Sequence, residues 1–201
     1  MSNTRPIYLK QKFRTGRGRA HYPCVITPDT KFKEEGEYSS DIILPDEDAL
    51  ARVKKAYALA RKEWPNLVGA KGKKTASLPW DENDDGTFRV RLRRVARTRT
   101  GSLTRVKIVD SSGMPLTGKA AEFGHGSIID VGFSARVWFT PALGYGVSFM
   151  PDIVMLHEAR FENAASVDDY GFEVDGDADG ASADDGMPGD DDGTFEDEDE
   201  F

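Results

Sequence analysis

Arginine occurs at every second position in one segment of the sequence, and this spacing suits contact with a polyanion. The segment is "TFRVRLRRVART", in which arginines alternate with apolar residues: Arg89, Arg91 and Arg93 with Phe88, Val90 and Leu92. On a β-strand such arginines share one face at intervals of about 7 Å, close to the phosphate spacing of a nucleic-acid backbone. Residues 87–109 contain no Asp or Glu. The segment therefore predicts an unopposed cationic row that contacts nucleic acid.

Other basic residues of the body could extend this row. They lie near the N-terminus, in a glycine-containing loop and after the row itself: Arg14, Arg17 and Arg19; Lys71, Lys73 and Lys74; Arg97, Arg99, Arg105 and Lys107. Because Lys and Arg neutralise phosphates whatever the base sequence, we expect these residues to track a nucleic-acid backbone.

Trp138 is the aromatic residue best placed to stack on a nucleobase. In "SIIDVGFSARVWF", period-two alternation puts it on the same face as Arg136 and opposite Phe139. An exposed indole beside a guanidinium offers a stacking surface for single strands, whereas burial under a loop is the alternative. Tyr22 in "AHYPC" and Tyr145 in "ALGYGVS" are further stacking candidates.

The charges divide the chain into a basic body and an acidic tail. The 201 residues carry 27 Lys and Arg against 35 Asp and Glu, a net charge of −8. Residues 168–201 hold 16 of the acids and no base, which leaves the body with 19 acids against 27 bases. From about residue 166 the composition cannot bury enough apolar surface to fold, so we expect residues 166–201 to be disordered. Such a tail could compete with an anionic partner for the basic body.

Two motifs point to other ligands, and each lacks a necessary residue. The segment "GMPLTGKA" follows the spacing of a phosphate-binding loop, but Ala120 has no hydroxyl for Mg²⁺ and the glycine-rich sequence beyond it does not predict a helix. A hairpin turn at Pro115 is the better interpretation. The segment "DENDDG" opens like a calcium loop, but its twelfth position is Leu92 and not Glu. We interpret Asp81–Asp85 as a solvated loop, with a weak cation site as the alternative.

The sequence predicts neither a cofactor site nor a membrane segment. Its histidines, His21, His125 and His157, lack the spacing of a zinc site, and the lone Cys24 allows no intrachain disulfide. The N-terminus has no apolar signal core, and no run approaches the roughly 20 apolar residues of a membrane span. We therefore expect a soluble, cytoplasmic protein without a cofactor.

Two other classes of function stay open beside nucleic-acid binding. Body carboxylates such as Asp41 and Asp130 could hold the metal ions of a nuclease, although no second acid with a nearby Lys completes that arrangement. The basic face could instead bind an acidic protein, which would make the chain an interaction adaptor. We expect binding without catalysis.

The elements that would position these residues are mainly β-strands. Turn-bounded apolar segments predict strands at 22–28, 37–45, 87–98, 103–110, 127–139 and 146–161, with the third and fourth paired across a turn near Gly101. Five or six short strands with one intervening helix predict a small barrel elaborated by loops. The basic segment 1–20, with "TGRGRA", is expected to be a flexible arm.

One helix is expected between the second and third of these strands. Asp46 can cap it, and apolar residues recur at three- and four-residue spacing from Leu50 to Trp64. Pro65 disfavours helical geometry at the residue before it, so the helix should end at Trp64.

Together these segments resemble the phage single-stranded DNA-binding proteins that combine an OB-fold with an acidic C-terminal tail. The resemblance covers about residues 20–161 and the tail, and it rests on "AHYPCVITPD", "GEYSSDIILP", "EDALARVKKAYALARKEW", "VDSSGMPL", "VGFSARVWFTPA" and "GYGVSFMPDIVML". It implies that residues 21–165 form a mainly β, OB-fold-like barrel of five to six strands with one inserted helix. Such a protein would protect single-stranded DNA during phage replication, recombination and repair in the host cytoplasm.

The tail carries the more specific part of the resemblance. It ends in an acidic run closed by an aromatic residue: Glu196, Asp197, Glu198, Asp199, Glu200 and Phe201. The resemblance implies that this tip docks replication enzymes, typically the DNA polymerase and the primase-helicase. It also implies that the tail can occupy the DNA groove when DNA is absent. A second copy of the chain, in a homodimer, is a further partner that this interpretation allows.

Overall fold

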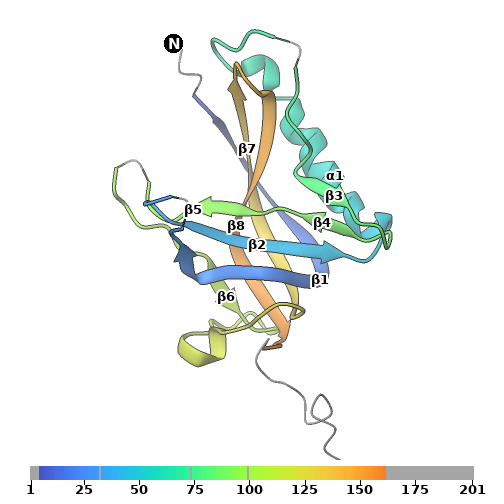
Figure 1. The fold of residues 1–201 in the computed structure, drawn as a ribbon, viewed down its shortest axis with the longest axis vertical. Helices are drawn as coiled ribbons and strands as arrows, with labels where there is room; N and C mark the ends of the chain where they lie inside the picture. The colour runs from blue at the N-terminus through green and yellow to red at the C-terminus, as the bar shows by residue number, and fades with distance from the viewer. Residues whose placement is uncertain (1–4, 32, 73, 99, 162–201) are drawn as a thin grey trace, which may run out of the picture. The chain divides into compact units, whose positions relative to one another are not determined.

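The computed structural model describes residues 5–31, 33–72, 74–98 and 100–161 (Figure 1). Its elements are β1 (Ile7–Asp29), β2 (Glu37–Leu44), α1 (Glu47–Arg61), β3 (Trp80–Glu82), β4 (Phe88–Val90), β5 (Arg93–Val95), β6 (Lys107–Val109), β7 (Ile128–Thr140) and β8 (Gly144–Glu158). The strands form one sheet in the order β3-β4-β2-β1-β7-β8-β6, and β5 pairs with β2. The described chain is mainly β with one α-helix, as predicted, but it has eight strands where five or six were expected.

β1 contradicts the flexible arm that we expected at residues 1–20. From Ile7 to Arg19 this strand pairs with β7, and from Arg19 to Asp29 it pairs with β2. Figure 1 shows β1 running beside β7 and then turning to cross the molecule beside β2. Most of the expected arm is therefore an integral strand, which pairs first with β7 and then with β2.

The glycines of "TGRGRA" explain why this basic segment is ordered. Gly16 has a φ of +85° and lies where the register between β1 and β7 shifts. At Gly18 a Cβ would come within 2.5 Å of the carbonyl oxygen of Ile43 on β2. The two glycines thus permit a β-bulge and a close strand approach, which a composition-based reading mistakes for flexibility.

The β7–β8 hairpin has the side-chain phase that the sequence predicts. Alternate β7 residues are buried in the core: Ile129, Val131, Phe133, Ala135, Val137 and Phe139. Arg136 and Trp138 lie on the opposite face and are partly exposed. The predicted placement of Trp138 beside Arg136 is therefore confirmed.

α1 covers the core through one face and ends earlier than predicted. The Asp46 carboxylate caps it by accepting a hydrogen bond of 2.8 Å from the Ala49 backbone N–H, as expected. The helix ends at Arg61 rather than Trp64, because the following N–H groups bond three residues back and tighten the chain toward a 3₁₀ turn at Trp64–Asn66. Within the described part of the chain, no helix is both long and apolar enough to cross a membrane.

β6 corrects the pairing expected for residues 103–110. Only the end of the expected hairpin next to the turn forms, where Leu103 pairs with Arg97. The chain then leaves β5, and β6 pairs in parallel with β8, with Lys107 opposite Ile153. Closure of the sheet into a barrel stays a prediction.

The two ligand-like motifs form local turns. The backbone N–H of Asp110 donates to the Met114 carbonyl and Val109 pairs with Pro115, so the expected hairpin forms. Its turn lies at residues 111–113, however, and Pro115 follows the bend instead of setting it. In the other loop the Asp85 carboxylate accepts hydrogen bonds from Thr87, chiefly from its hydroxyl, and these lower the pKa of Asp85. Cation binding at that loop stays untested.

Candidate nucleic-acid interface

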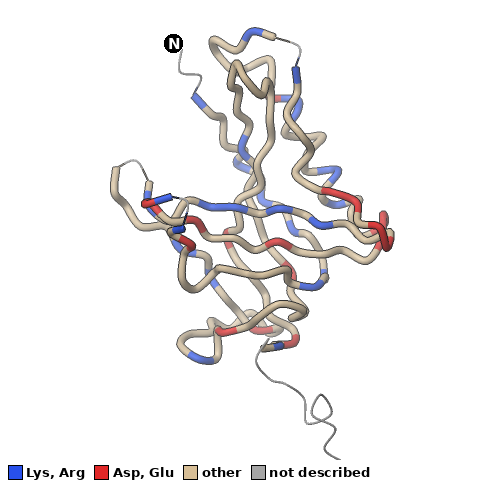
Figure 2. The backbone as a smooth tube through the Cα atoms, viewed as in Figure 1, with Lys and Arg blue, Asp and Glu red and all other residues tan. Residues whose placement is uncertain are grey.

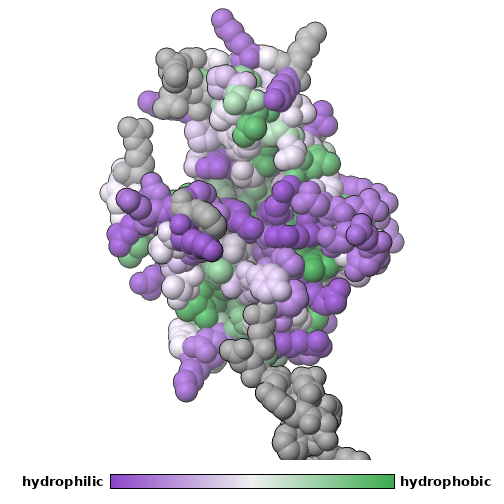
Figure 3. Space-filling model, in the orientation of Figure 1, coloured by the Kyte–Doolittle hydropathy of each residue, from purple (hydrophilic) through white to green (hydrophobic). Residues whose placement is uncertain are grey.

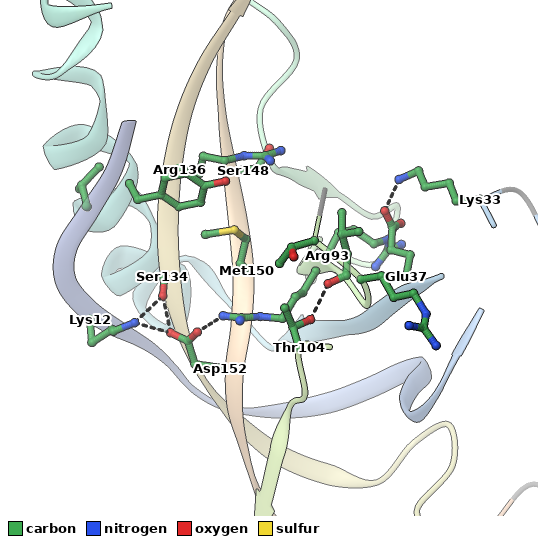
Figure 4. Close-up of a pocket in the computed structure, with 16 residues that line it drawn as sticks. Lys12, Lys33, Glu37, Arg93, Thr104, Ser134, Arg136, Ser148, Met150 and Asp152 are labelled. Carbon is green, nitrogen blue, oxygen red and sulfur yellow. Dashed lines mark hydrogen bonds and ion pairs between the residues drawn. The ribbon is translucent and has the colours of Figure 1, made fainter. Parts of the chain in front are cut away.

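A groove of about 880 Å³ lies between two walls of the sheet (Figure 4). The start of β1 and the β7–β8 hairpin form one wall, while β5 and the chain just after β1 form the other. Six cationic side chains and two acidic ones line the groove: Lys12, Lys33, Arg93, Arg94, Arg97 and Arg136, with Glu37 and Asp152. This excess of positive charge suits a polyanion.

Asp152 on β8 organises the first wall. Its carboxylate accepts hydrogen bonds from Lys12 at 3.0 Å, from the Ser134 hydroxyl and from Arg94. The Arg94 Nε also donates to the Pro151 carbonyl at 2.7 Å, so Arg94 is fixed at two points. Figure 4 shows Lys12, Ser134 and Asp152 together on this side, with Arg93, Glu37 and Lys33 on the other. One carboxylate therefore positions two cations, Lys12 and Arg94, at the groove, and the three side chains together keep a net positive charge.

The arginine row was predicted to have no opposing charges, and Asp41 on β2 contradicts this prediction. Its side chain is only 2% exposed, and it accepts hydrogen bonds of 3.1 and 2.9 Å from Arg89 and of 2.9 Å from Arg93. Arg91 instead lies 3.4 Å from Asp81 on β3. The counter-charges come from neighbouring strands, which the local sequence cannot reveal. Figure 2 shows acidic positions interspersed among the basic ones along the chain, and Figure 3 shows that much of the surface in this view is hydrophilic.

Arg136 differs from most groove cations because no described carboxylate pairs with it. Lys12, Lys33, Arg93 and Arg94 each form an ion pair with a groove carboxylate or with Asp41. Within the described chain, Arg97 and Arg136 form none, and the Nε of Arg136 is buried without a hydrogen-bond acceptor. The positive charge of Arg136 is thus not compensated by a described carboxylate, which suits contact with an anionic ligand.

Trp138 lies at the Arg136 end of the groove with one face of its indole covered. The indole N–H donates to the hydroxyl of Ser148, a groove residue, at 2.8 Å. Across the strand pair it lies opposite Gly146, where a Cβ would come within 2.2 Å of the ring. The absence of that Cβ lets the indole lie against the β8 backbone. The ring is thus pre-positioned, and Trp138 is partly exposed.

The three N-terminal arginines predicted to bind DNA lie on β1 but do not line the groove. The Arg14 Nε donates to Asp130 at 3.0 Å, and this hydrogen bond and charge raise the pKa of Arg14. Arg17 and Arg19 are exposed and border a separate, mostly apolar pocket of about 400 Å³. They could extend a cationic surface but do not form one site with Trp138.

The remaining predicted cations are dispersed. Lys74 lies against the tip of the β7–β8 hairpin, where its Nζ donates to the Ala142 carbonyl at 2.8 Å, and Lys71 is exposed in the same loop. Arg105 and Lys107 are exposed at and just before β6, and Arg97 lines the groove. Outside the described residues lie Lys73, Arg99 and the tail positions Glu196, Asp197, Glu198, Asp199, Glu200 and Phe201.

Tyr145 is placed differently from Trp138, although both were predicted to stack on bases. It alternates onto the other face of β8, where its ring lies 5.3 Å from Trp64 in a stacked arrangement and 5.0 Å from Phe139. Arg61 lies over the Trp64 ring at 4.9 Å. Tyr145 thus belongs to an aromatic cluster packed against the core.

Thirteen of the sixteen groove residues were not among the predicted site residues, and they include Tyr8, Lys12, Lys33 and Arg94. The first two lie in the segment interpreted as an arm. Arg94 is out of phase with the alternating arginines, because the strand is interrupted between β4 and β5. The doublet of Arg93 and Arg94 was the one signal in the sequence that could have indicated such an interruption.

The carboxylates considered for a nuclease are held by arginines. Asp41 accepts hydrogen bonds from Arg89 and Arg93, and Asp130 accepts them from Arg14 and from the Gly16 backbone N–H. Among the described residues, no group of three or more His, Cys, Asp or Glu side chains could hold a metal ion.

Comparisons with known proteins support the fold. No protein-family model matches the chain, and no curated protein matches its sequence. Among solved structures, gp2.5, a single-stranded DNA-binding protein encoded by bacteriophage T7, matches with a TM-score of 0.60 and 24% identity, over 88% of this chain and 100% of that one. The single-stranded DNA-binding protein from bacteriophage Enc34 matches with a TM-score of 0.55 and 14% identity, over 84% and 99% of the two chains.

A third match is the Enc34 protein in complex with single-stranded DNA. Its TM-score is 0.53 at 15% identity, over 75% of this chain and 88% of that one. At such identities the likeness establishes the fold, and it agrees with the resemblance found in the sequence. The chain therefore has the mainly β, OB-fold-like architecture of these phage single-stranded DNA-binding proteins.

Proposed function

We propose that this protein binds single-stranded DNA without strong sequence preference and protects it during phage DNA replication and recombination. The observation that carries the proposal is the pairing of Arg136 and Trp138 at one end of a cationic groove. Among the described residues Arg136 forms no ion pair, and the indole next to it lies against β8. A phosphate would neutralise the Arg136 charge, and the base of the same nucleotide would stack on the indole. The matched phage proteins are themselves described as single-stranded DNA-binding.

The groove suits a strand whose sequence varies. Its cations would contact phosphates, which are identical along the chain, and Trp138 would stack on any base, since every base has a π-face. Asp41 and Asp152 fix the directions of Arg93 and Arg94, so fewer side-chain rotamers would be lost on binding. Binding of this kind needs no catalytic group.

We assign the acidic tail two roles. Its 16 negative charges would compete with DNA for the basic groove, because tethering keeps their local concentration high. Its tip, from Glu196 to Phe201, would dock replication enzymes such as a DNA polymerase or a primase-helicase, with the acids steering the encounter and the aromatic ring filling a pocket. Residues 166–201 would act as this tail, and self-association into a homodimer stays a prediction.

A gel-shift titration tests the proposal. Single-stranded and duplex oligonucleotides of the same sequence would be compared at two salt concentrations, with and without a chelator. Tighter, salt-sensitive, chelator-independent binding of the single strand is expected. Metal-dependent cleavage would favour the nuclease, and failure to bind any oligonucleotide would favour the adaptor that binds an acidic protein.

A further inference from the structure

Tyr22 occupies an unusual backbone conformation within β1. Its φ is +44°, and among the described residues other than glycine it alone has a positive φ. Between His21 and Cys24 the strand advances three residues while β2 advances two, so a bulge places Tyr22 outside the regular pairing. Pro23 follows and further restricts the backbone of Tyr22. Such backbone strain is concentrated at functional sites.

The bulge presents the Tyr22 ring as the outer surface of an aromatic stack. Tyr22 is 61% exposed, and its ring lies parallel to that of His125, with centroids 4.5 Å apart and an interplanar angle of 13°. His21 supports both rings edge-on, 4.8 Å from Tyr22 and 5.3 Å from His125. The Nδ1 atoms of His21 and His125 are buried without a hydrogen-bond partner. The stack therefore carries a second free-energy cost, which comes from the unsatisfied Nδ1 atoms of His21 and His125.

The stack is held rigidly. The loop that carries His125 is bound to β1 by two backbone hydrogen bonds, from Gly126 N–H to the Ala20 carbonyl at 2.9 Å and from Ala20 N–H to the Ser127 carbonyl at 2.8 Å. One face of the Tyr22 ring is thus covered by a fixed partner. A fixed ring with an exposed surface is the arrangement that stacking on a nucleobase requires.

The charge around the stack is positive. His21 lies opposite Asp41, which holds Arg89 and Arg93. Burial, and then the nearby Arg89, lower the pKa of His21, which is consistent with a cationic surrounding for the stack. Phosphates next to a stacked base would therefore meet arginines.

The stack also lies in line with the groove. Cys24 on β1 pairs with Ser39 on β2, and Ser39 pairs with Arg93, which lines the groove. Two strand spacings, about 10 Å, thus separate this part of β1 from the groove wall. A strand leaving the groove at Arg93 would reach Tyr22 within a few nucleotides.

We propose that Tyr22, stacked on His125, is a second base-stacking site, which takes a nucleobase of the single strand where it leaves the groove beside Arg93. This inference rests on the proposed function. It assigns the strand a path from Trp138 through the groove and across the bulge of β1. The bulge then has a physical purpose, because it turns the ring outward from a strand that would otherwise direct it elsewhere.

The test compares Tyr22→Gly with Tyr22→Phe in the full-length protein. Glycine accepts a φ of +44° without strain, so Tyr22→Gly removes the ring and should not unfold the chain. Phenylalanine keeps the ring and should bind as the wild type does. Ile26→Ala is the control, since Ile26 is an exposed apolar residue of the same strand at 49% exposure. Thermal unfolding of each variant establishes that it is folded.

The measurement uses two deoxythymidine oligomers and the quenching of tryptophan fluorescence. The short oligomer is the shortest that saturates the quench, and the long one extends it by several nucleotides at either end. Tyr22→Gly should bind the long oligomer about tenfold more weakly and the short one normally. Equal affinity of Tyr22→Gly and wild type for the long oligomer would overturn the second site, as would equal losses for both oligomers.

A cross-link gives an independent readout. 5-Iododeoxyuridine placed near the ends of the long oligomer should photocross-link to Tyr22, and mass spectrometry should locate the adduct. Cross-links only to groove residues would overturn the second site while leaving the proposed function intact. If no oligomer quenches the wild-type protein, the proposed function itself fails.

Discussion

Gly146 lies against the indole ring of Trp138, and a Cβ at position 146 would come within 2.2 Å of the ring atom Cζ2. No such contact can form without displacing the ring or the strand. The glycine therefore determines the orientation of the aromatic side chain that we propose stacks on a base.

Gly146→Ala should accordingly weaken single-strand binding although it adds only a methyl group. The indole would turn away from β8 and lose its hydrogen bond to Ser148. We expect an affinity loss approaching that of Trp138→Ala, which should be on the order of 1–3 kcal/mol. Fluorescence quenching by DNA should shrink in both variants, whereas Trp64→Phe, in the aromatic cluster, should leave affinity unchanged. Unfolding of Trp138→Ala would mean that the indole is part of the core.

Binding should weaken steeply with salt. If the groove cations contact four to six phosphates, the plot of log K against log salt should slope by roughly −3 to −4, at about −0.7 per phosphate. Arg136→Gln should make the slope shallower by about that one increment. Arg91→Gln is the control, because Arg91 lies outside the groove and forms an ion pair with Asp81. A slope near zero would contradict a phosphate-binding groove.

Asp41→Asn should destabilise the fold. The Asp41 side chain is 2% exposed and neutralises Arg89 and Arg93, so its loss should lower the free energy of unfolding by on the order of 2–3 kcal/mol. Asp81→Asn, at an exposed ion pair, should change it by less than about 0.5 kcal/mol. Urea unfolding of both variants measures the contrast, and equal stabilities would show that the buried carboxylate is dispensable.

Stability should fall on mild acidification, partly through His21. Burial, followed by the nearby Arg89, lowers the pKa of His21 below its ordinary value of 6.5. The unfolded chain then takes up the proton at higher pH than the folded chain, so this stabilising term is full above about pH 6.5 and is lost as the pH falls toward the folded pKa. His21→Gln should reduce the difference in unfolding free energy between pH 7.5 and pH 5.5. An unchanged difference would exclude His21 as a contributor.

The tail should have separable effects on DNA and on protein partners. Removing residues 168–201 takes away 16 negative charges and should tighten DNA binding, most strongly at low salt. Phe201→Ala keeps every side-chain charge, so DNA affinity should barely change, whereas docking to a replication enzyme should lose on the order of 2 kcal/mol. Both affinities would be measured for both variants. A charge-scrambled tail that retains Phe201 yet loses partner binding would show that the acids alone dock.

The sequence predicts side-chain phase better than it predicts partners. Alternation alone places Trp138 beside Arg136, and the cap at Asp46 follows from residue type, because both depend on neighbours within a few positions. The counter-charge of Arg89 could not be predicted, since Asp41 lies on another strand 48 residues away. The sequence did not predict that residues 7–20 form an ordered strand, for the same reason. This segment pairs with β2 and β7, which are distant in the sequence.

The pairing of β1 limits how far the groove can open to admit a ligand. The first residues of β1, with Tyr8 and Lys12, contribute to one wall of the groove, and Lys33 in the other wall lies four positions after its last residue, Asp29. Both walls are thus anchored to a single strand that hydrogen-bonds to neighbours along its length. The groove cannot widen without breaking the hydrogen bonds that join β1 to β2 and β7, so its width is fixed before a ligand binds. We therefore expect a flexible single strand to fit this groove more readily than a stiff double helix.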